Sequence, residues 1–531
     1  MALKINFNAE ATVTHTALLQ NERAMNKSLL RISTGNRILS AADDAAGLFI
    51  ANQLSVFAAA LEQGNRNIQT GISALQIAET NVGQIFDKLK TIYTKAQSAA
   101  NDINDPNARS SLQRDIANLV DAIQKLATDT EYNGIKLLDG TFASKVIHYG
   151  ARADQTITVG INSVKANDLG AFMVTGSYST TQATASANAG SSVANGYTAS
   201  TGAVASGGAF RWDNGDRAFV AGIDVSTGLS FAVDAKKIAD NINSSTNLQN
   251  AGISARASNT SKAAAGWTDI QVGTGQSLEI RFFVGSDNTA DITISVGAGQ
   301  VLTLSDLVTQ INRQASQDNI NITAKADNNR LVLTTQGETI GLEVSASAAA
   351  NAGSISVNMA QFLGLSSTGQ NVSATATSTA AASATGSAIQ VGKLVIMGTD
   401  KYNYDFTGIT SQGAGLGINP ATGDAAFKNL YFLDVTNNEN AEIALDIVKT
   451  AIQRVDKIRT QIGSVINNLQ AIWDGQKASY DNTKEAENVI RNTDFAAEMS
   501  TFITMQIRMQ SGIAMLAQAN ALPQLVLQLL R

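Results

Sequence analysis

The C-terminal stretch, residues 499–530, constrains the fold of this chain more than any other part of it. Arg508 is its only charged residue. The apolar residues that recur at helical spacing are Met505, Met509, Ile513, Leu516, Leu525 and Leu529. Exposing apolar surface costs on the order of 25 cal/mol per Å², so a helix of this composition needs a partner. A lipid bilayer, the rest of the chain and further copies of the chain are the three candidates.

A membrane span is the first alternative for this stretch. Residues 509–530 carry no charge and reach the roughly 20 residues that a span requires. Several polar or helix-breaking residues interrupt them, however, and no Lys/Arg cluster flanks them; the interruptions are Gln510, Gln518, Asn520, Pro523, Gln524 and Gln528. Packing against protein is therefore favoured, and no membrane insertion is expected.

Charge and composition exclude several functional classes. The net charge is -6 and there is no basic run, which argues against binding nucleic acid. The chain has 0 Cys, so disulfides and thiolate chemistry are excluded. His15 and His148 are isolated, whereas a metal site needs several converging ligands. The sequence predicts no catalytic residue, no cofactor and no metal site.

Long helical stripes lie near both ends of the chain. The first consists of Ile68, Ile72, Leu75, Val82, Ile85, Leu89, Ile92, Ala96 and Ala99. The second consists of Val448, Ile452, Val455, Ile458, Ile462, Val465, Leu469 and Ile472. Steps of three, four or seven over so many residues are typical of coiled-coil-like helices. Two stripes of matched length predict helices that pack together and close the intervening chain into an inserted region.

Local signals mark where these helices begin and end. Gly35 interrupts the helical pattern of residues 1–42. Asp43 and Asp44 suit the capped start of the next helix; a paired-carboxylate catalytic site is the alternative, but no His lies nearby. Residues 104–107 contain Pro106 and end that helix. A further helix is expected over residues 110–127, and Asn133-Gly134 predicts a hairpin turn.

The middle of the chain has a different composition and contains an internal repeat. Residues 176–208 and 364–388 are mostly Ser, Thr, Ala and Gly, which is typical of linkers or exposed loops. Between them, Ile242 matches Ile311 and Ile253 matches Ile322 at a constant offset, 311 − 242 = 322 − 253 = 69. Each copy has alternating strand residues, a short helix ending in Ile-Asn and another strand, which predicts two small α+β units.

Both ends of the chain resemble the bacterial flagellins. Residues 30–35 read Leu-Arg-Ile-Ser-Thr-Gly, and residues 40–48 read Ser-Ala-Ala-Asp-Asp-Ala-Ala-Gly-Leu. Residues 494–498 read Asp-Phe-Ala-Ala-Glu, and residues 516–520 read Leu-Ala-Gln-Ala-Asn. The resemblance covers about the first 165 and the last 100 residues, and these motifs together are highly specific.

The resemblance implies an α+β multidomain protein. Its long N- and C-terminal helices would pack as a coiled-coil bundle, with β-rich or α+β outer domains inserted between them. Residues 1–42 and 486–531 would be filament-core helices, and residues 43–175 and 401–485 the helical core domain. Residues 176–400 would form the exposed outer region, with the two repeats at about 217–265 and 277–363.

The function that the resemblance implies is that of a structural subunit, without enzymatic activity, of the extracellular flagellar filament. The partners would be many copies of the same chain, an export chaperone on the C-terminal helix, the filament cap and the hook–filament junction proteins. The absence of cysteine and of a signal-peptide pattern agrees with unfolded export through a type III channel. A secreted adhesin and a flagellar junction protein are the alternative functions.

Assembly contacts are expected on the apolar ends, which should be loosely ordered in the free monomer. The candidate residues are Leu3, Ile5, Leu18, Leu29, Leu516, Leu525 and Leu529, and the alternative for each is a place in the core of its own subunit. Flagellins detected by the innate-immune flagellin receptor carry Arg and Glu in the middle of the first long helix. The matching residues here are Leu89, Lys90, Thr91, Ile92, Tyr93 and Thr94, so weak receptor activation is expected.

Overall fold

The computed structural model describes residues 8–101, 103–188, 197, 202–206, 210–365, 371–409 and 415–529. The chain divides into two compact units. Unit 1 comprises Met1–Thr80, Thr130–Asn162 and Arg459–Arg531, and unit 2 comprises Asn81–Asp129 and Ser163–Ile458. Two helices, α2 (Ala45–Ala99) and α7 (Asn438–Arg491), contribute residues to both units.

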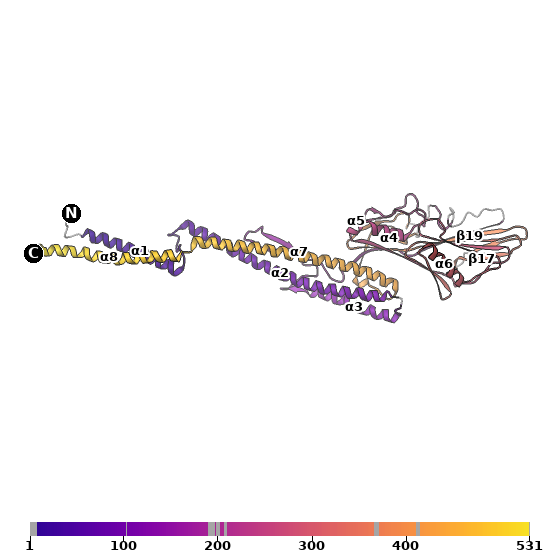
Figure 1. Ribbon diagram of the computed structural model, residues 1–531, viewed down its shortest axis with the longest axis horizontal. Helices are drawn as coiled ribbons and strands as arrows, with labels where there is room; N and C mark the ends of the chain where they lie inside the picture. The colour runs from indigo at the N-terminus through magenta and orange to yellow at the C-terminus, as the bar shows by residue number, and fades with distance from the viewer. Residues whose placement is uncertain are drawn as a thin grey trace. The chain divides into compact units, whose positions relative to one another are not determined.

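Unit 1 is mainly helical. Helices α1 (Ala9–Thr34) and α8 (Phe495–Leu529) lie side by side along their lengths (Figure 1). Two hairpins, β1 (Glu131–Tyr132) with β2 (Ile135–Lys136) and β3 (Lys145–His148) with β4 (Thr156–Val159), complete the unit. Asn133 and Gly134 have φ values of 49° and 75° between β1 and β2, which confirms the predicted turn.

The predicted helical stripes are buried, with a few exceptions. In α2, Ile72 alone of the predicted set is only half-buried. In α7, Ile452, Val465 and Ile472 are half-buried, whereas Ala451 and Ile466 are buried. Helix α3 (Pro106–Asp129) starts at its proline, because a proline at the first helical position loses no hydrogen bond. The fold class expected from the sequence is confirmed: long terminal helices enclose a β-rich middle region.

Two antiparallel sheets dominate the rest of unit 2. The six-stranded sheet has the order β14 (Thr323–Asp327), β15 (Arg330–Thr335), β9 (Ile253–Lys262), β20 (Lys393–Gly398), β5 (Gly170–Thr175) and β23 (Ala426–Asn429). The five-stranded sheet has the order β12 (Ile292–Val296), β11 (Gln276–Val284), β16 (Ile340–Ala348), β19 (Ala382–Val391) and β6 (Ser179–Asn188).

Smaller elements cover these sheets. The helices are α4 (Ala235–Ser244), α5 (Thr246–Asn250) and α6 (Leu304–Asp318), with single 3-10 turns η1 (Met359–Gln361) and η2 (Leu430–Phe432). A four-stranded sheet contains β22 (Thr422–Asp424), β21 (Asn403–Asp405), β7 (Phe219–Val220) and β8 (Ile223–Asp224). The pairs β10 (Ile270–Gln271) with β13 (Val301–Leu302) and β17 (Ser354–Asn358) with β18 (Asn371–Thr375) complete the unit.

The two copies of the sequence repeat adopt the same local structure. Asn243, at the end of α4, donates to Ala255 O (2.7 Å) and accepts from Ala255 N (2.9 Å). Asn312 in α6 makes the same two bonds with Ala324, at 2.9 and 2.8 Å. Each copy contributes to its own hydrophobic core, one around Ile238 and Ile242 and the other containing Ile311. The repeats are therefore two packed modules, each with a helix locked onto its following strand.

The expectation that the Ser/Thr/Ala-rich segments are linkers or exposed loops is wrong for most of their described residues. They form β6, β18 and β19, and β19 lies in the interior of its sheet, paired with β16 on one side and β6 on the other. Ala382, Ala384 and Ala388 of β19 are buried in the core of the second repeat. Alternation of alanine with serine or threonine gives a strand one apolar face, and low complexity concealed that pattern.

Candidate assembly surface

Helix α1 is fixed at both ends by hydrogen bonds that its sequence provides. Asn8 accepts from Ala11 N (3.0 Å) as the N-cap and donates through Nδ2 to Ala519 O (2.8 Å) of α8. Gly35 ends the helix with φ 72°, a left-handed conformation that favours glycine, and its N–H bonds to Arg31 O. The start of α1 is thus tied to the end region of α8.

Polar contacts also join the other end of the α1–α8 pair. Ser28 Oγ donates to Glu498 O (3.3 Å), and Arg31 lies 3.7 Å from the Glu498 carboxylate. Arg31 is in the last turn of α1 and Glu498 in the first turn of α8, where each charge also suits the dipole of its own helix. Leu18 packs close to Gly512, in the middle of the pair.

A short antiparallel bridge lies where α1 ends and α8 begins. Asn36 pairs with Asn492, Arg37 N donates to Arg491 O (2.7 Å), and Thr493 N donates to Gly35 O (2.9 Å). Nearby, Glu487 is almost fully buried and is paired with Lys484 (2.8 Å) and Arg491 (3.4 Å). Lys484 first, and then Arg491, hold the pKa of Glu487 below its ordinary value. The residues that resemble the flagellin motifs therefore gather at this bridge.

Asp43 and Asp44 have structural partners. Asp43 accepts from Leu39 N and Ser40 N, and Lys27 Nζ lies 2.5 Å from it. The Lys27 ammonium holds the pKa of Asp43 below its ordinary value. Asp44 accepts from Gly47 N (2.8 Å) in the first turn of α2. The interpretation of this pair as helix-starting residues is confirmed.

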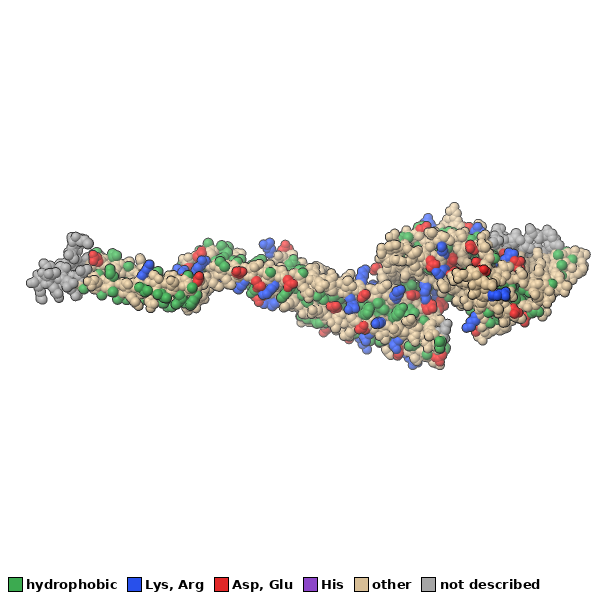
Figure 2. Space-filling view, viewed as in Figure 1, with side chains coloured by type: hydrophobic (Ala, Val, Ile, Leu, Met, Phe, Trp, Pro, Cys, Tyr) green, Lys and Arg blue, Asp and Glu red, His purple; other side chains and the backbone are tan. Residues whose placement is uncertain are grey.

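Apolar side chains remain exposed on the α1–α8 pair although the two helices pack together. Helix α8 is apolar on every side, whereas a helix on the surface of a soluble domain usually has one polar face. Figure 2 shows hydrophobic side chains spread along the outside of the pair. The exposed ones are Val13, Leu19, Leu29, Leu30, Phe495, Ile503, Ile507, Ile513 and Met515. We call these residues the outer apolar surface.

The first turns of α2 add a second exposed apolar group, which contains Phe49, Ile50, Val56 and Phe57. Among the described residues, α2 is the one helix whose length and composition would allow it to cross a membrane. Only 17% of the apolar window that gives this result is buried. Long core helices of soluble proteins pass the same test, so we interpret this group as further surface that needs a protein partner.

The seven residues expected to make assembly contacts fall into three groups. Leu3 and Ile5 lie outside the described residues, and Leu525 and Leu529 are on α8 but their side chains also lie outside them. Leu18 and Leu516 are half-buried within the pair. Leu29 is 50% exposed and belongs to the outer apolar surface.

Sequence reasoning missed most of the outer apolar surface, including Val13, Ile503 and Ile507. Met505, Met509 and Leu516 form the half-buried stripe of α8. The residues between them, on the other sides of the helix, were the signal that this stripe is not the only apolar one.

The residues matched to the immune-receptor region are divided between core and surface. Leu89 and Ile92 are buried in the stripe of α2, and Tyr93 is half-buried. Lys90, Thr91 and Thr94 are exposed. Only these three side chains present a surface that a partner can touch.

The large cavity of unit 2 has no arrangement that suggests catalysis. It has a volume of about 970 Å³ and lies between β9, α4 and the start of α7. Its charged groups neutralise one another, since Arg256 pairs with Glu442 (2.8 Å) and Lys236 with Asp240 (2.5 Å). Within the described part of the chain, no three His, Asp or Glu side chains come together as metal ligands do.

Comparison with known proteins gives full-length matches. Residues 5–143 match the bacterial flagellin N-terminal helical region, and residues 445–530 match the bacterial flagellin C-terminal helical region. A flagellin of Aquifex pyrophilus is 52% identical over 533 residues and a flagellin of Aquifex aeolicus 48% over 541, each covering 100% of both chains. Flagellin B of Helicobacter pylori is 30% identical over 547 residues, again covering 100% of both.

Solved structures give only distant matches. FliC from Burkholderia pseudomallei is 14% identical, with 75% of this chain and 99% of that chain covered and a TM-score of 0.29. The flagellar junction protein FlgL from Legionella pneumophila is 11% identical, with 83% and 99% covered and a TM-score of 0.30. At these TM-scores the structural matches add nothing to the sequence matches.

Proposed function

The chain belongs to the bacterial flagellin family and is a structural subunit of the flagellar filament, and we propose that the outer apolar surface of α1 and α8 is where one copy binds the next. The observation that carries this proposal is the exposure of large apolar side chains on every side of α8. Ile507, for example, is 57% exposed. Burying such side chains against other copies removes apolar surface from water and favours the polymer.

Uncharged polar residues support the same proposal. Glutamines and threonines lie between the apolar residues of α8, where charged residues would oppose close packing of many copies. Burying an unpaired charge is far more costly than burying an amide that finds a hydrogen-bond partner. A polymer of identical subunits can supply such partners at every interface.

The same surface bears on the location and the other partners of the chain. We assign no catalytic activity to the chain, and we place it outside the cell, in the filament. An export chaperone would cover the apolar C-terminal helix before assembly, because that surface otherwise stays in water. The filament cap and the hook–filament junction proteins are the other partners we propose, and we propose no insertion into a membrane.

A charge placed in the outer apolar surface tests the proposal. We expect Ile507→Asp to raise the critical concentration for polymerisation at least about tenfold, because a buried unpaired carboxylate costs more than the roughly 1.4 kcal/mol that a tenfold change requires. Sedimentation of polymer and negative-stain microscopy measure this. The matched control is Val301→Asp, since Val301 is also exposed, at 48%, but belongs to the outer region of unit 2.

The outcome decides between functions as well as surfaces. Long tubes from the unaltered chain and from Val301→Asp, but not from Ile507→Asp, are the expected result. Normal tubes from Ile507→Asp would remove α8 from the interface. Short rings or no polymer from the unaltered chain would favour a junction protein or an adhesin.

Weak activation of the innate-immune flagellin receptor remains a proposal. Thr91 and Thr94 are exposed and three residues apart, so they share one face of α2. Neither can make the bidentate hydrogen bonds of an arginine. We expect purified monomer to give a low response in a receptor reporter assay and the double variant Thr91→Arg/Thr94→Glu to raise it. A strong response from the unaltered monomer would contradict the proposal.

A further inference from the structure

The two repeats of unit 2 are joined by hydrogen bonds to the segment just before α4. Phe231 N and Ala232 N both donate to Ser286 O at 3.0 Å, and Ser286 Oγ donates to Ala232 O at 2.7 Å. Thr339 Oγ1 donates to Val233 O at 2.6 Å. We call this set of contacts the repeat junction. It connects the first repeat to the β11–β12 and β15–β16 turns of the second.

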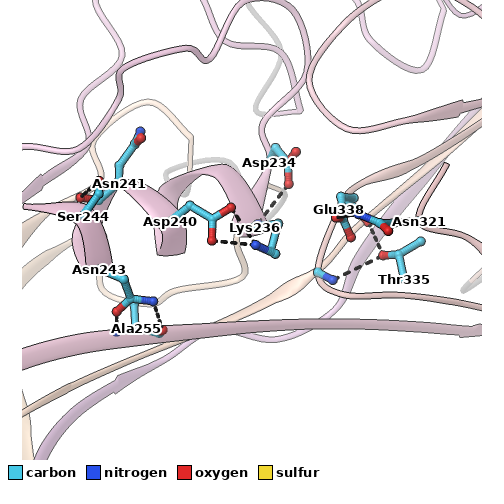
Figure 3. A network of polar contacts seen from close by, with 11 residues as sticks. Asp234, Lys236, Asp240, Asn241, Asn243, Ser244, Ala255, Asn321, Thr335 and Glu338 are labelled. Carbon is cyan, nitrogen blue, oxygen red and sulfur yellow. Dashed lines mark hydrogen bonds and ion pairs between the residues drawn. The ribbon is translucent and has the colours of Figure 1, made fainter. Parts of the chain in front are cut away.

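Asp234 is the next residue, and it lies buried at this junction. It is 4% exposed, and its Oδ1 accepts from Lys236 N (2.9 Å) at the start of α4. The side chain of Lys236 pairs with Asp240 instead, as Figure 3 shows. Among the described residues, no ammonium or guanidinium group forms an ion pair with Asp234. The carboxyl group is therefore buried without a compensating positive charge.

The other charged groups near Asp234 are negative. Glu338, in the turn after β15, accepts from Asn321 Nδ2 (3.1 Å) through Oε1, while its Oε2 is buried without a hydrogen-bond partner in the described part of the chain. Figure 3 shows Glu338 on the second repeat, opposite the start of α4. Asp287 and Asp291, after β11, and the buried hydroxyl of Tyr197 also belong to these surroundings. These groups add negative charge or none, so they do not stabilise two carboxylates together.

Burial and the neighbouring negative charge favour a protonated carboxyl. Burial is the larger cause and Glu338 adds to it, whereas the N–H groups of Lys236, Lys237 and Thr339 oppose it; the net effect raises the pKa of Asp234 to about 7. Burial likewise raises the pKa of Asp291 above its ordinary value. These directions agree with the geometry, in which two acidic groups share one dry site.

The second repeat shows that the fold does not require a carboxyl group at this position. The residue 69 places after Asp234 is Thr303 (234 + 69 = 303). Thr303 starts α6 in the same way, accepting from Asp306 N at 3.2 Å. A neutral hydroxyl thus serves as the N-cap there. The titratable group at Asp234 is an addition that only the first repeat carries.

We propose that the repeat junction is a proton-controlled lock, in which a proton held by Asp234 and Glu338 makes the two repeats unfold as one body and its loss lets them unfold separately. The folded chain binds this proton more tightly than the unfolded chain does. The added stability is therefore complete below the ordinary pKa of an aspartate, 3.8, and is lost as the pH rises through about 7. Alkaline conditions loosen the junction.

The full-length chain offers a direct test, because each repeat contains one tryptophan. Trp212 reports the first repeat and Trp267 the second, while Trp473 lies in α7. Replacing Trp473 and one of the other two by Phe leaves a single reporter. Guanidinium unfolding followed by fluorescence then gives a midpoint for each repeat at pH 5.5 and pH 8.5. We expect coincident midpoints at pH 5.5 and lower, separated midpoints at pH 8.5.

The size of the effect follows from the two pKa values. For a single group shifted from 3.8 to about 7, the unfolding equilibrium constant rises about thirtyfold between pH 5.5 and 8.5. We expect Asp234→Thr, which introduces the residue type of Thr303, to reduce this change to less than about threefold. Asp240→Asn is the matched control, since Asp240 is an exposed carboxylate on the same helix, and it should keep the full change.

Two outcomes would overturn the proposal. One is a pair of midpoints in the unaltered background that stays coincident and unshifted at pH 8.5. The other is an Asp234→Thr chain that loses stability with pH as the unaltered chain does. Asp234→Asn, which keeps the shape of the protonated carboxyl, repeats the comparison if the threonine variant does not fold.

Discussion

Tyr197 illustrates how much a single side chain contributes to the outer region. Its ring stacks on Phe283 with centroids 4.0 Å apart, and its N–H donates to Glu343 Oε2 at 2.6 Å. The ring is fully buried over Gly341, where a Cβ atom would lie 2.2 Å from it. Glycine at 341 is therefore required for space rather than for backbone conformation.

We expect Gly341→Ala to destabilise unit 2 by about 1–3 kcal/mol, the usual cost of forcing an extra carbon into a packed site. Thermal unfolding followed by near-ultraviolet circular dichroism measures this, because Tyr197 and Phe283 contribute to that signal. Gly266→Ala is the control, since a Cβ there meets nothing nearer than 3.8 Å. Equal stability of the two variants would show that Tyr197 can move aside without cost.

At this scale the sequence predicted less than it did for whole helices. The assembly residues were chosen because they are apolar and helical, but the sequence does not show which side of α8 faces α1. Leu18 and Leu516 lie within the pair, whereas Leu29 lies on its outside. A helix that is apolar all round gives no moment from which to assign a face.

Ion pairs attach the start of α7 to the six-stranded sheet. Arg256 of β9 reaches Glu442 (2.8 Å) and Asp446 (3.4 Å), and Lys393 of β20 reaches Glu439 (2.5 Å). Burial is the main cause that raises the pKa of Asp446 above its ordinary value, while Arg256 opposes it. One arginine therefore serves two carboxylates in the first turns of a helix.

We expect Arg256→Ala to cost about 1 kcal/mol, a modest value because the pair is partly exposed to water. The effect should appear as faster hydrogen exchange in residues 438–446, and should shrink at high salt. Lys401→Ala is the matched control, because the Lys401–Asp424 pair is well exposed on both sides. Unchanged exchange at the start of α7 would mean that packing alone holds this helix to the sheet.

Elements with a clear period were predicted well, and those without one were not. The stripes of α2 and α7 and the turn at Asn133-Gly134 follow from spacing and turn chemistry. The strands β6 and β19 were mistaken for loops, because alanine and serine differ little in hydrophobicity and their alternation is faint. Their pairing on both sides, through backbone groups that every residue has, decided their structure.

For the whole molecule, the division into a helical unit and a β-rich unit predicts that the two respond differently to truncation. We expect deletion of residues 500–531 to abolish polymer in a sedimentation assay, because it removes most of α8 and uncovers α1. Unit 2 has its own cores, so its tryptophan fluorescence and unfolding midpoint should stay unchanged. Polymer from the truncated chain would contradict the assembly proposal, and loss of unit 2 would contradict its independence.

The sequence predicted this division in outline, since the stripes, the composition change and the repeat each mark a region. It did not predict that α2 and α7 each contribute to both units, because a continuous stripe contains no signal for where one set of neighbours replaces another. The expectation that the chain ends are loosely ordered in the free monomer stays a prediction. Limited proteolysis of monomer and polymer tests it.

Asn243 and Asn312 make identical bonds 69 residues apart (312 − 243 = 69). Such a pair is what a tandem gene duplication leaves behind: one ancestral module was copied, and the copies then diverged at positions such as Asp234 and Thr303. A region that grew by copying can grow or shrink again in the same way. Evolutionary changes in the length of this region should therefore come in whole modules, each recognisable by its own asparagine.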